Sequence, residues 1–231
     1  MIALEAVQFR YEAMLMHFDL QVARGEFMAV IGPSGAGKST LLSLIAGFEE
    51  PVSGCIRIAD IDMQGVPPDQ RAVSMIFQDN NSFAHLDVWT NVALGISTSL
   101  NLDAERRAHI DGALERVGLA AYRTRKPTEI SGGEKQRIAV ARALVRDKPV
   151  LLLDEPFTAL GPALRREMLD LIRDIRAEKN LTILMVTHQP EDAEYAASRV
   201  AFVDAGRVAH VLPTEAFFAG TAPSKIRAYL A

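Results

Sequence analysis

The segment Gly32–Ser39 carries the residue types that bind phosphate groups. It reads GPSGAGKS and matches the pattern G-x-x-x-x-G-K-[ST] at every fixed position. Its glycines allow a tight turn whose backbone N–H groups point inward at phosphate oxygens, and the next helix directs its positive end to the same place. Lys38 supplies a cation for the β- and γ-phosphates, and the Ser39 hydroxyl can bind Mg²⁺. The pattern therefore predicts a phosphate-binding loop.

Two acidic residues end an apolar run farther along the chain. The segment Val150–Glu155 reads VLLLDE, and an unpaired buried carboxylate is costly, so the acids need a reason to be there. One explanation is that the two acids lie on the surface at the end of a strand. The other is a neighbouring phosphate loop, where Asp154 would lie beside Mg²⁺ and Glu155 would polarise an attacking water. Together with the phosphate loop, the pair favours the second interpretation and predicts hydrolysis.

Four further features are weak when each is taken alone. The segment Ser131–Glu134 reads SGGE; its serine suits a helix N-cap, and its glycines leave N–H groups open to an anion. A simple cap is the alternative. Gln78 and His188 each follow an apolar run, where a polar residue is usually solvated or structural. Tyr11 is either an ordinary aromatic or a platform on which a base stacks.

Short apolar runs predict the elements that must position these residues. Strands are expected at Phe27–Ile31, Val150–Leu153 and Leu181–Val186, and helices at Ser39–Phe48 and Pro162–Glu178. The strands are apolar on both faces, which is typical of a parallel sheet covered by helices on both sides. The alternating order predicts an α/β fold.

Two regions depart from that pattern. Residues 79–145 contain helical stretches and no strand run, which predicts a helical subdomain inserted into a core made of residues 1–78 and 146–231, all within a single domain 1–231. Near the N-terminus, three segments alternate as strands do and predict a small antiparallel part. The helical stretches are Asp103–Val117 and Glu134–Val145, and the alternating segments are Ile2–Phe9, Phe18–Val22 and Cys55–Ile61.

Composition excludes several classes of protein. The chain has 231 residues, 49% of them hydrophobic, with 25 Lys plus Arg against 29 Asp plus Glu and one cysteine. The chain is not expected to be disordered, because disorder needs low hydrophobicity with high net charge. It is not a disulfide scaffold, because its one cysteine has no partner in the chain. The mildly acidic balance disfavours binding to nucleic acid. Apolar runs are too short to span a membrane, and the N-terminus lacks a signal-peptide pattern, so another chain is expected to provide any membrane attachment.

The order of the motifs is more specific than any one of them, and it resembles the ATP-binding subunit of ABC transporters over essentially all 231 residues. In that family GPSGAGKST is the Walker A motif, ISGGEKQR resembles the LSGGQ signature, and VLLLDE is Walker B. Gln78 falls at the Q-loop, His188 at the switch histidine and Tyr11 at the adenine-stacking aromatic. The resemblance thus assigns nucleotide binding to Tyr11, Gly32, Pro33, Ser34, Gly35, Ala36, Gly37, Lys38, Ser39, Thr40, Ser131, Gly132 and Gly133, Mg²⁺ binding to Ser39, Gln78 and Asp154, and catalysis to Glu155, His188 and Gln78.

The same resemblance implies a fold, cofactors and partners. The fold would be a phosphate-loop NTPase cassette, with a mainly parallel sheet, a small antiparallel β part and the helical subdomain. ATP and Mg²⁺ would bind in a head-to-tail homodimer, with the signature of one subunit over the phosphate loop of the other. The partners would be integral-membrane permease subunits and, indirectly, a periplasmic solute-binding protein, with no nucleic acid. The protein would lie peripherally on the cytoplasmic face of the inner membrane.

The permease is expected to dock near residues 80–92. Apolar side chains stand there beside Gln78, namely Phe83, Leu86, Val88 and Trp89. The alternative is that they form ordinary subdomain core.

Within the family, three stretches resemble the ATPase subunit of bacterial thiamine importers. They read PPDQRAVSMIFQDNNSFAHLDV, LLSLIAGF and PALRREML, and they imply that the solute is thiamine or its phosphates. Importers of another small solute and a membrane-associated regulator without transport remain alternatives. ABC ATPases of DNA repair share the motifs but carry long insertions that are missing here.

One position departs from the family. Thr158–Gly161 reads TALG where the family usually reads SALD. The missing Asp normally helps two subunits to signal across their interface. Its absence puts the coupling of hydrolysis between subunits in question, and leaves the ATP site itself untouched.

Overall fold

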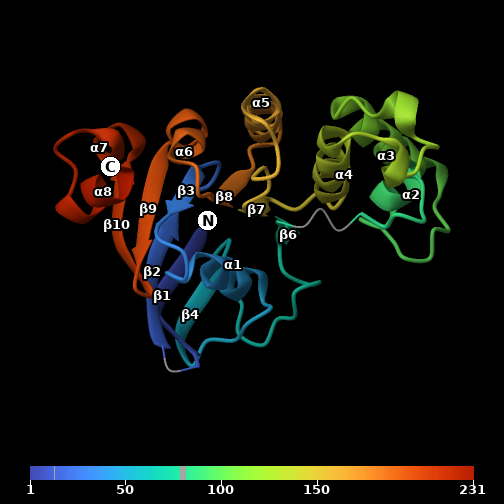
Figure 1. Ribbon diagram of the computed structural model, residues 1–231. Helices are drawn as coiled ribbons and strands as arrows, with labels where there is room; N and C mark the ends of the chain where they lie inside the picture. The colour runs from blue at the N-terminus through green and yellow to red at the C-terminus, as the bar shows by residue number, and fades with distance from the viewer. Residues whose placement is uncertain (13, 79–81) are drawn as a thin grey trace.

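The structure is a computed structural model that describes residues 1–12, 14–78 and 82–231 (Figure 1). Its strands are β1 (Ile2–Tyr11), β2 (Met14–Val22), β3 (Phe27–Ile31), β4 (Ser53–Ile58), β5 (Ile61–Asp62), β6 (Val73–Ile76), β7 (Val150–Asp154), β8 (Thr182–Val186), β9 (Arg199–Asp204) and β10 (Arg207–Pro213). The helices are α1 (Lys38–Ala46), α2 (Val88–Ala93), α3 (Ala104–Arg116), α4 (Gly132–Leu144), α5 (Pro162–Lys179), α6 (Pro190–Ala196), α7 (Thr214–Phe218) and α8 (Ser224–Leu230), with short 3₁₀ turns η1 (Ala120–Tyr122) and η2 (Pro127–Glu129). In these described ranges the strands form one sheet in the order β5-β4-β1-β2-β10-β9-β3-β8-β7-β6.

The centre of the sheet is parallel and buried on both faces. Strands β9, β3, β8, β7 and β6 pair in parallel. Along β3, Phe27, Ala29 and Ile31 point into one hydrophobic core, whereas Met28 and Val30 point into the other. Figure 1 shows α5 and α6 on one side of these strands and α1 on the other. The prediction of an α/β fold with a two-sided parallel sheet is therefore confirmed.

The antiparallel part forms one edge of the same sheet. Strand β1 pairs with β2 and β4, and β4 pairs with β5, all antiparallel, which confirms the predicted N-terminal antiparallel pairing. Its link to the rest is a parallel contact between β10 and β2 at Arg207 and His17. The sequence did not show that the two parts are continuous, because strands β9 and β10, which join them, carry no strong alternation.

The helices match the periodic stretches of the sequence closely. Helices α1, α3, α4 and α5 begin and end within three residues of the predicted bounds. Between residues 82 and 145, where all positions are described, helices and 3₁₀ turns occur and no strand does. Figure 1 shows α2, α3 and α4 grouped together, to the side of the sheet. No helix in the described ranges is both long and apolar enough to cross a bilayer.

Arg71 fixes the end of α1 from inside the core. Its side chain, in a residue only 4% exposed, donates to the carbonyls of Leu44, Ile45, Met63 and Val66 at 2.8, 3.0, 3.1 and 2.9 Å. The helix ends at Gly47 with φ +86°, and a Cβ built there would lie 2.4 Å from Arg71 Nε. Glycine is therefore needed both for the left-handed turn and for room beside the guanidinium.

Replacing Arg71 by methionine should destabilise the protein strongly. The variant leaves four carbonyls without their buried donors, so we expect the free energy of unfolding to fall by about 3–4 kcal/mol, measured by urea titration. Arg57→Met is the matched control, because Arg57 forms an exposed ion pair with Glu5 at 3.1 Å and should cost no more than about 1 kcal/mol. Equal losses in the two variants would contradict this account of Arg71.

Candidate functional site

The loop between β3 and α1 encloses the side chain of Lys38. Gly37 has φ +101° and starts the helix, and a Cβ at Gly32 would lie 1.9 Å from the carbonyl oxygen of Val203. Lys38 is 5% exposed, and its Nζ donates to the carbonyls of Gly32 and Pro33 at 2.8 and 2.9 Å. The glycines thus let the loop turn back over its own lysine, whose ammonium group lies at the centre of the loop.

Asp154 lies beside the first turn of α1. The Ser39 hydroxyl donates to Asp154 Oδ1 at 3.0 Å, although β8 lies between β3 and β7 in the sheet. The contact forms because the carboxyl ends of parallel strands share one edge of the sheet, where loops from non-adjacent strands can meet. The serine of the phosphate loop and the acid at the end of β7 are therefore next to each other, 115 residues apart in the chain.

Glu155 and His188 are in direct contact. His188 Nε2 lies 2.5 Å from Glu155 Oε1, and only 11% of the glutamate side chain is exposed. Glu155 has φ +47°, in the left-handed region that non-glycine residues rarely adopt, and its N–H donates to the carbonyl of Val186 at 3.1 Å. This backbone bond ties the end of β7 to the end of β8. Strained backbone of this kind clusters at functional sites.

The site holds two carboxylates, Asp154 and Glu155, near the ammonium group of Lys38. Burial raises the pKa of Asp154, as does the nearby charge of Glu155, whereas the hydrogen bond from Ser39 and the charge of Lys38 act in the opposite direction. Burial lowers the pKa of Lys38, against the pull of both carboxylates. Two carboxylates close to one partly buried ammonium group form a place where a further cation is electrostatically favoured.

The donor set fits Mg²⁺ bound together with phosphates. Mg²⁺ prefers oxygen ligands, and it commonly binds one or two carboxylates plus substrate phosphates; Ser39 and Asp154 offer a hydroxyl and a carboxylate 3.0 Å apart. Among the residues that the structure describes, no group of three or more His, Cys, Asp or Glu side chains could hold a metal ion alone. A metal here would therefore need phosphate or water oxygens as well.

The other predicted site residues come from three other places in the fold, and one of them, Gln78, lies at the same edge of the sheet, because it follows β6, whose Ile76 pairs with Leu153 of β7. Tyr11 is 57% exposed at the turn between β1 and β2, and Gln78 is exposed after β6. Ser131 caps α4, since Glu134 N–H donates to its hydroxyl at 3.3 Å and the glutamate carboxylate accepts from Ser131 N–H at 2.7 Å. Figure 1 shows α4 grouped with α2 and α3, apart from α1. In the single chain, the SGG segment and the phosphate loop do not form one site.

Sequence reasoning missed several residues that contact the site. Tyr229 of α8 comes close to the phosphate loop: burial raises the pKa of its hydroxyl, a hydrogen bond with the backbone of Gly32 opposes that shift, and the charge of Glu155 adds to it. Gln136 of α4, 2% exposed, donates to the carbonyl of Pro156, directly after Glu155. A buried glutamine on an apolar helix face was a signal that the sequence offered, whereas nothing local pointed to Tyr229.

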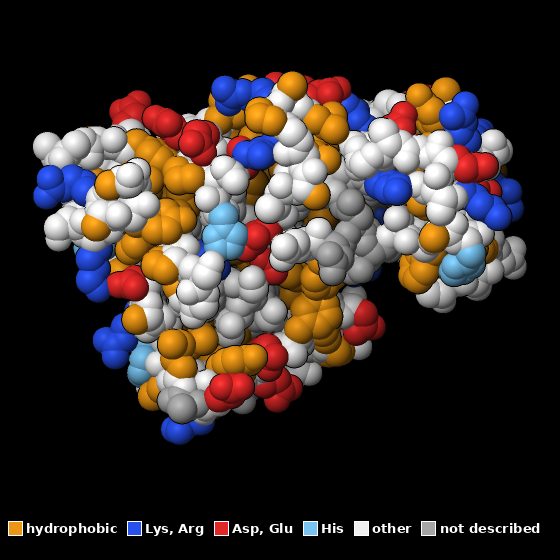
Figure 2. Space-filling model, viewed as in Figure 1, with side chains coloured by type: hydrophobic (Ala, Val, Ile, Leu, Met, Phe, Trp, Pro, Cys, Tyr) orange, Lys and Arg blue, Asp and Glu red, His pale blue; other side chains and the backbone are white. Residues whose placement is uncertain are grey.

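Charged side chains mark the middle of one face of the molecule (Figure 2). Figure 2 shows acidic and histidine side chains gathered near the centre of this face, over the ends of the central strands. A hydrophobic patch lies beside them, towards the helical group. The charged cluster and the apolar patch are thus neighbours on one exposed face.

Comparison with known proteins agrees with this geometry. Residues 15–158 match the family model described as ABC transporter. The thiamine import ATP-binding protein ThiQ of Mesorhizobium japonicum is 52% identical over 229 residues, which cover 99% of this chain and 90% of that protein. ThiQ of Vibrio cholerae is 50% identical over 208 residues, covering 90% and 87%.

Solved structures show the same architecture. The ATP-binding cassette MJ0796, in a dimeric post-hydrolysis state bound to ADP and Pi, superposes with a TM-score of 0.80 at 28% identity, covering 93% of this chain and 99% of that one. The cbiO1 protein of Clostridium perfringens, part of the ABC transporter complex cbiONQ, superposes with a TM-score of 0.85 at 28% identity, covering 95% and 90%. With its phosphate loop, its paired carboxylates and these relatives, the chain belongs to the ABC transporter family, as an ATP-binding subunit that hydrolyses ATP.

Proposed function

We propose that this chain powers the import of thiamine or its phosphates through a membrane permease. The solute is supported by thiamine import proteins that are 50–52% identical over nearly the whole chain. The assignment of ATP hydrolysis rests on the cluster at the strand ends, where Ser39 contacts Asp154 and Glu155 contacts His188. The protein would work peripherally at the cytoplasmic face of the inner membrane, with a periplasmic binding protein delivering the solute to the permease.

Within the site, each residue receives one role. Lys38 would exchange the carbonyls of Gly32 and Pro33 for the β- and γ-phosphates, and residues 32–40 would surround the phosphates with N–H groups. Ser39 and Asp154, with Gln78, would hold Mg²⁺, which when bound neutralises phosphate charge. Glu155 would orient the attacking water, a role supported by its contact with His188 at 2.5 Å. His188 would steady the γ-phosphate.

A second copy of the chain would complete the nucleotide site. The SGG segment, Ser131–Gly133, lies at the start of α4, and the N–H groups of its two glycines can bind an anion. A head-to-tail homodimer would bring this segment of one subunit over the phosphate loop of the other, with the adenine stacked on Tyr11. Residues 79–145 would act as a helical subdomain of the single cassette domain, and ATP would be bound between the two subunits until hydrolysis releases them.

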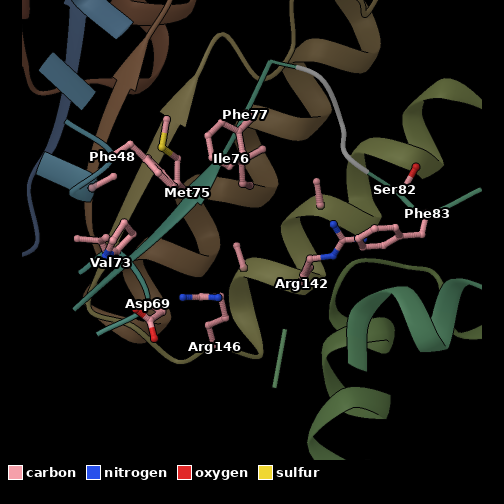
Figure 3. Close-up of a pocket in the computed structure, with 14 residues that line it drawn as sticks. Phe48, Asp69, Val73, Met75, Ile76, Phe77, Ser82, Phe83, Arg142 and Arg146 are labelled. Carbon is pink, nitrogen blue, oxygen red and sulfur yellow. The ribbon is translucent and has the colours of Figure 1, made fainter. Parts of the chain in front are cut away.

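The permease would dock in a cavity of about 680 Å³ between β6 and α4. Figure 3 shows Phe48 and Phe77 on one wall and Phe83 on the other, with Arg142 over its ring at 5.5 Å. The three phenylalanine residues are 38–53% exposed, which is unusual for side chains of this size and supports a binding surface.

The predicted docking stretch needs one correction. Val88 is fully buried, and Trp89 packs against the core and donates from Nε1 to Asp111 at 2.9 Å, so these two belong to the core of the helical group. Leu86 is half-buried. Asn80 and Asn81 lie outside the described residues. Phe83 remains the docking candidate of that stretch.

Replacing Glu155 by glutamine should separate hydrolysis from binding. The amide keeps the size of the side chain but cannot accept a proton, so we expect kcat for ATP to fall about 10²–10⁴-fold, with the affinity for a fluorescent ATP analogue kept. Glu191→Gln, on the exposed surface of α6, is the matched control. A Glu155→Gln protein that turns over at the normal rate would remove Glu155 from the mechanism.

Replacing Lys38 by alanine should abolish thiamine uptake in cells. In a strain deleted for the gene, labelled thiamine should enter only when the wild-type chain is restored, because Lys38→Ala removes the cation that faces the phosphates. If uptake persists in the deletion strain, and that strain has no other thiamine route, the solute assignment is wrong. The permease that co-purifies with the chain would then show whether another solute, or no solute, is moved.

Replacing the exposed phenylalanines of the cavity should release the permease. The double variant Phe48→Ser and Phe83→Ser removes apolar surface from both walls, so co-purification with the membrane subunits should fall at least tenfold. Ile61→Ser is the control, since Ile61 is 63% exposed on the distant edge strand β5. Similar losses in the control would mean that the cavity is not the docking site.

A further inference from the structure

Glu155 and His188 are each followed by a short segment that leads into a helix. Residues 156–161 follow Glu155 and enter α5, and Gln189 follows His188 and caps α6. The two helices pack against each other on the same side of the sheet (Figure 1). A contact that fixes α5 relative to α6 therefore restrains the segments that carry Glu155 and His188.

A mostly buried ion pair joins the first turns of these helices. Arg165 Nη1 lies 3.8 Å from Asp192 Oδ1, and only 17% and 11% of the two side chains are exposed. Burial raises the pKa of Asp192, and the charge of Arg165 acts against that shift. A buried carboxylate without its partner would be costly, so each charge depends on the other.

Each residue of the pair also forms a hydrogen bond with a segment that flanks a catalytic residue. Arg165 Nη2 donates to the carbonyl of Leu160 at 3.2 Å, in the segment that follows Glu155. On the other side, the Thr187 hydroxyl donates to Asp192 Oδ2 at 3.5 Å, and Gln189 N–H donates to the Thr187 hydroxyl at 3.0 Å. Thr187 and Gln189 are the two neighbours of His188. The contacts thus run without a break from residue 160 to the histidine segment.

A second set of contacts clamps the same two helices farther along. The Tyr195 ring of α6 lies beneath two arginines of α5, with the guanidinium carbons of Arg166 and Arg173 3.3 and 4.7 Å from its centroid. Its hydroxyl donates to the carboxylate of Asp170, also on α5. Helices α5 and α6 are therefore joined at several successive turns, which favours movement as one body.

The segment after Glu155 is held by its buried side chains Phe157 and Leu160, and by a backbone hydrogen bond from Leu160 N–H to the carbonyl of Phe157 at 3.0 Å. Gly161 provides no side chain to cap α5, and Gln136 holds the near end at Pro156. At the far end, Arg165 adds a side-chain hydrogen bond to the carbonyl of Leu160. Gly161 stands where the family usually carries an aspartate, and Arg165, four residues later, contacts the same segment.

We propose that Arg165 and Asp192 are positioning residues for ATP hydrolysis, which couple the segment after Glu155 to the segment around His188. The pair keeps the imidazole against the glutamate, so that both groups meet the γ-phosphate together. The inference rests on the proposed roles of Glu155 and His188, since the pair acts only through them.

The test is steady-state hydrolysis of MgATP by the full chain and its variants. Asp192→Asn keeps the shape and loses the charge, and Arg165→Gln loses the charge at the other end. We expect each to lower kcat about three- to thirtyfold, with KM changed less than twofold, as for a residue that positions others. The double variant should be no slower than the slower single one, because both remove the same link. Asp192→Glu, which keeps the charge, should retain most of the wild-type kcat.

Controls separate this role from general stability and from the site itself. Asp147→Asn removes an ion pair with Lys179, 2.9 Å long, at the other end of α5, and should leave kcat unchanged. Thermal unfolding checks each variant, and Arg165→Gln still tests the charge if Asp192→Asn does not fold. Wild-type kcat in the two single variants, or additive losses in the double one, would overturn the inference. Wild-type kcat in Glu155→Gln and His188→Ala would instead overturn the proposed site.

Discussion

Two adjacent carboxylates at the end of a fully buried strand set the electrostatic constraint on the rest of the site. Asp154 and Glu155 are partly buried and close to each other, which raises the pKa of Asp154. The Ser39 hydroxyl, the Lys38 ammonium group and the His188 imidazole approach them from segments that follow two other strands. The set can assemble only because β3, β8 and β7 run parallel and end at one edge of the sheet.

Buried side-chain donors hold the backbone around this edge. Gln136 donates to the carbonyl of Pro156 and Arg165 to that of Leu160, whereas Arg71 bonds carbonyls at the far end of α1, away from this edge. A buried loop carbonyl without a partner is costly, so each of these contacts removes that penalty. The segment after Glu155 is consequently held by side chains that need not touch a nucleotide, and the helix that follows the phosphate loop is held at its far end.

The parts of the fold that the sequence revealed are those encoded locally. The phosphate loop, the serine cap of SGGE and the apolar runs of β3, β7 and β8 depend on residues within about ten positions of one another. What the sequence concealed depends on distant residues: that β8 lies between β3 and β7, that β10 joins the antiparallel edge, and that Tyr229 at the C-terminus reaches the phosphate loop. Val88 shows a second limit of sequence-based prediction. An apolar residue in the stretch after Gln78 is compatible with a docking surface or with core, and only its burial in the structure decides between them.

Gly161 is a departure that no local requirement of this chain explains. Its φ and ψ are −65° and 160°, which any residue can adopt, and a Cβ built there would meet no atom within 4 Å among the described residues. Neither backbone strain nor crowding within the subunit therefore demands glycine. A side chain at this position would point into open space, where only a second molecule could receive it, as in the proposed dimer. In the proposed dimer, glycine at this position would leave one subunit with fewer groups with which to contact the other. Within the chain, Arg165 and Asp192 lie between the segment after Glu155 and the histidine segment, and they contact both.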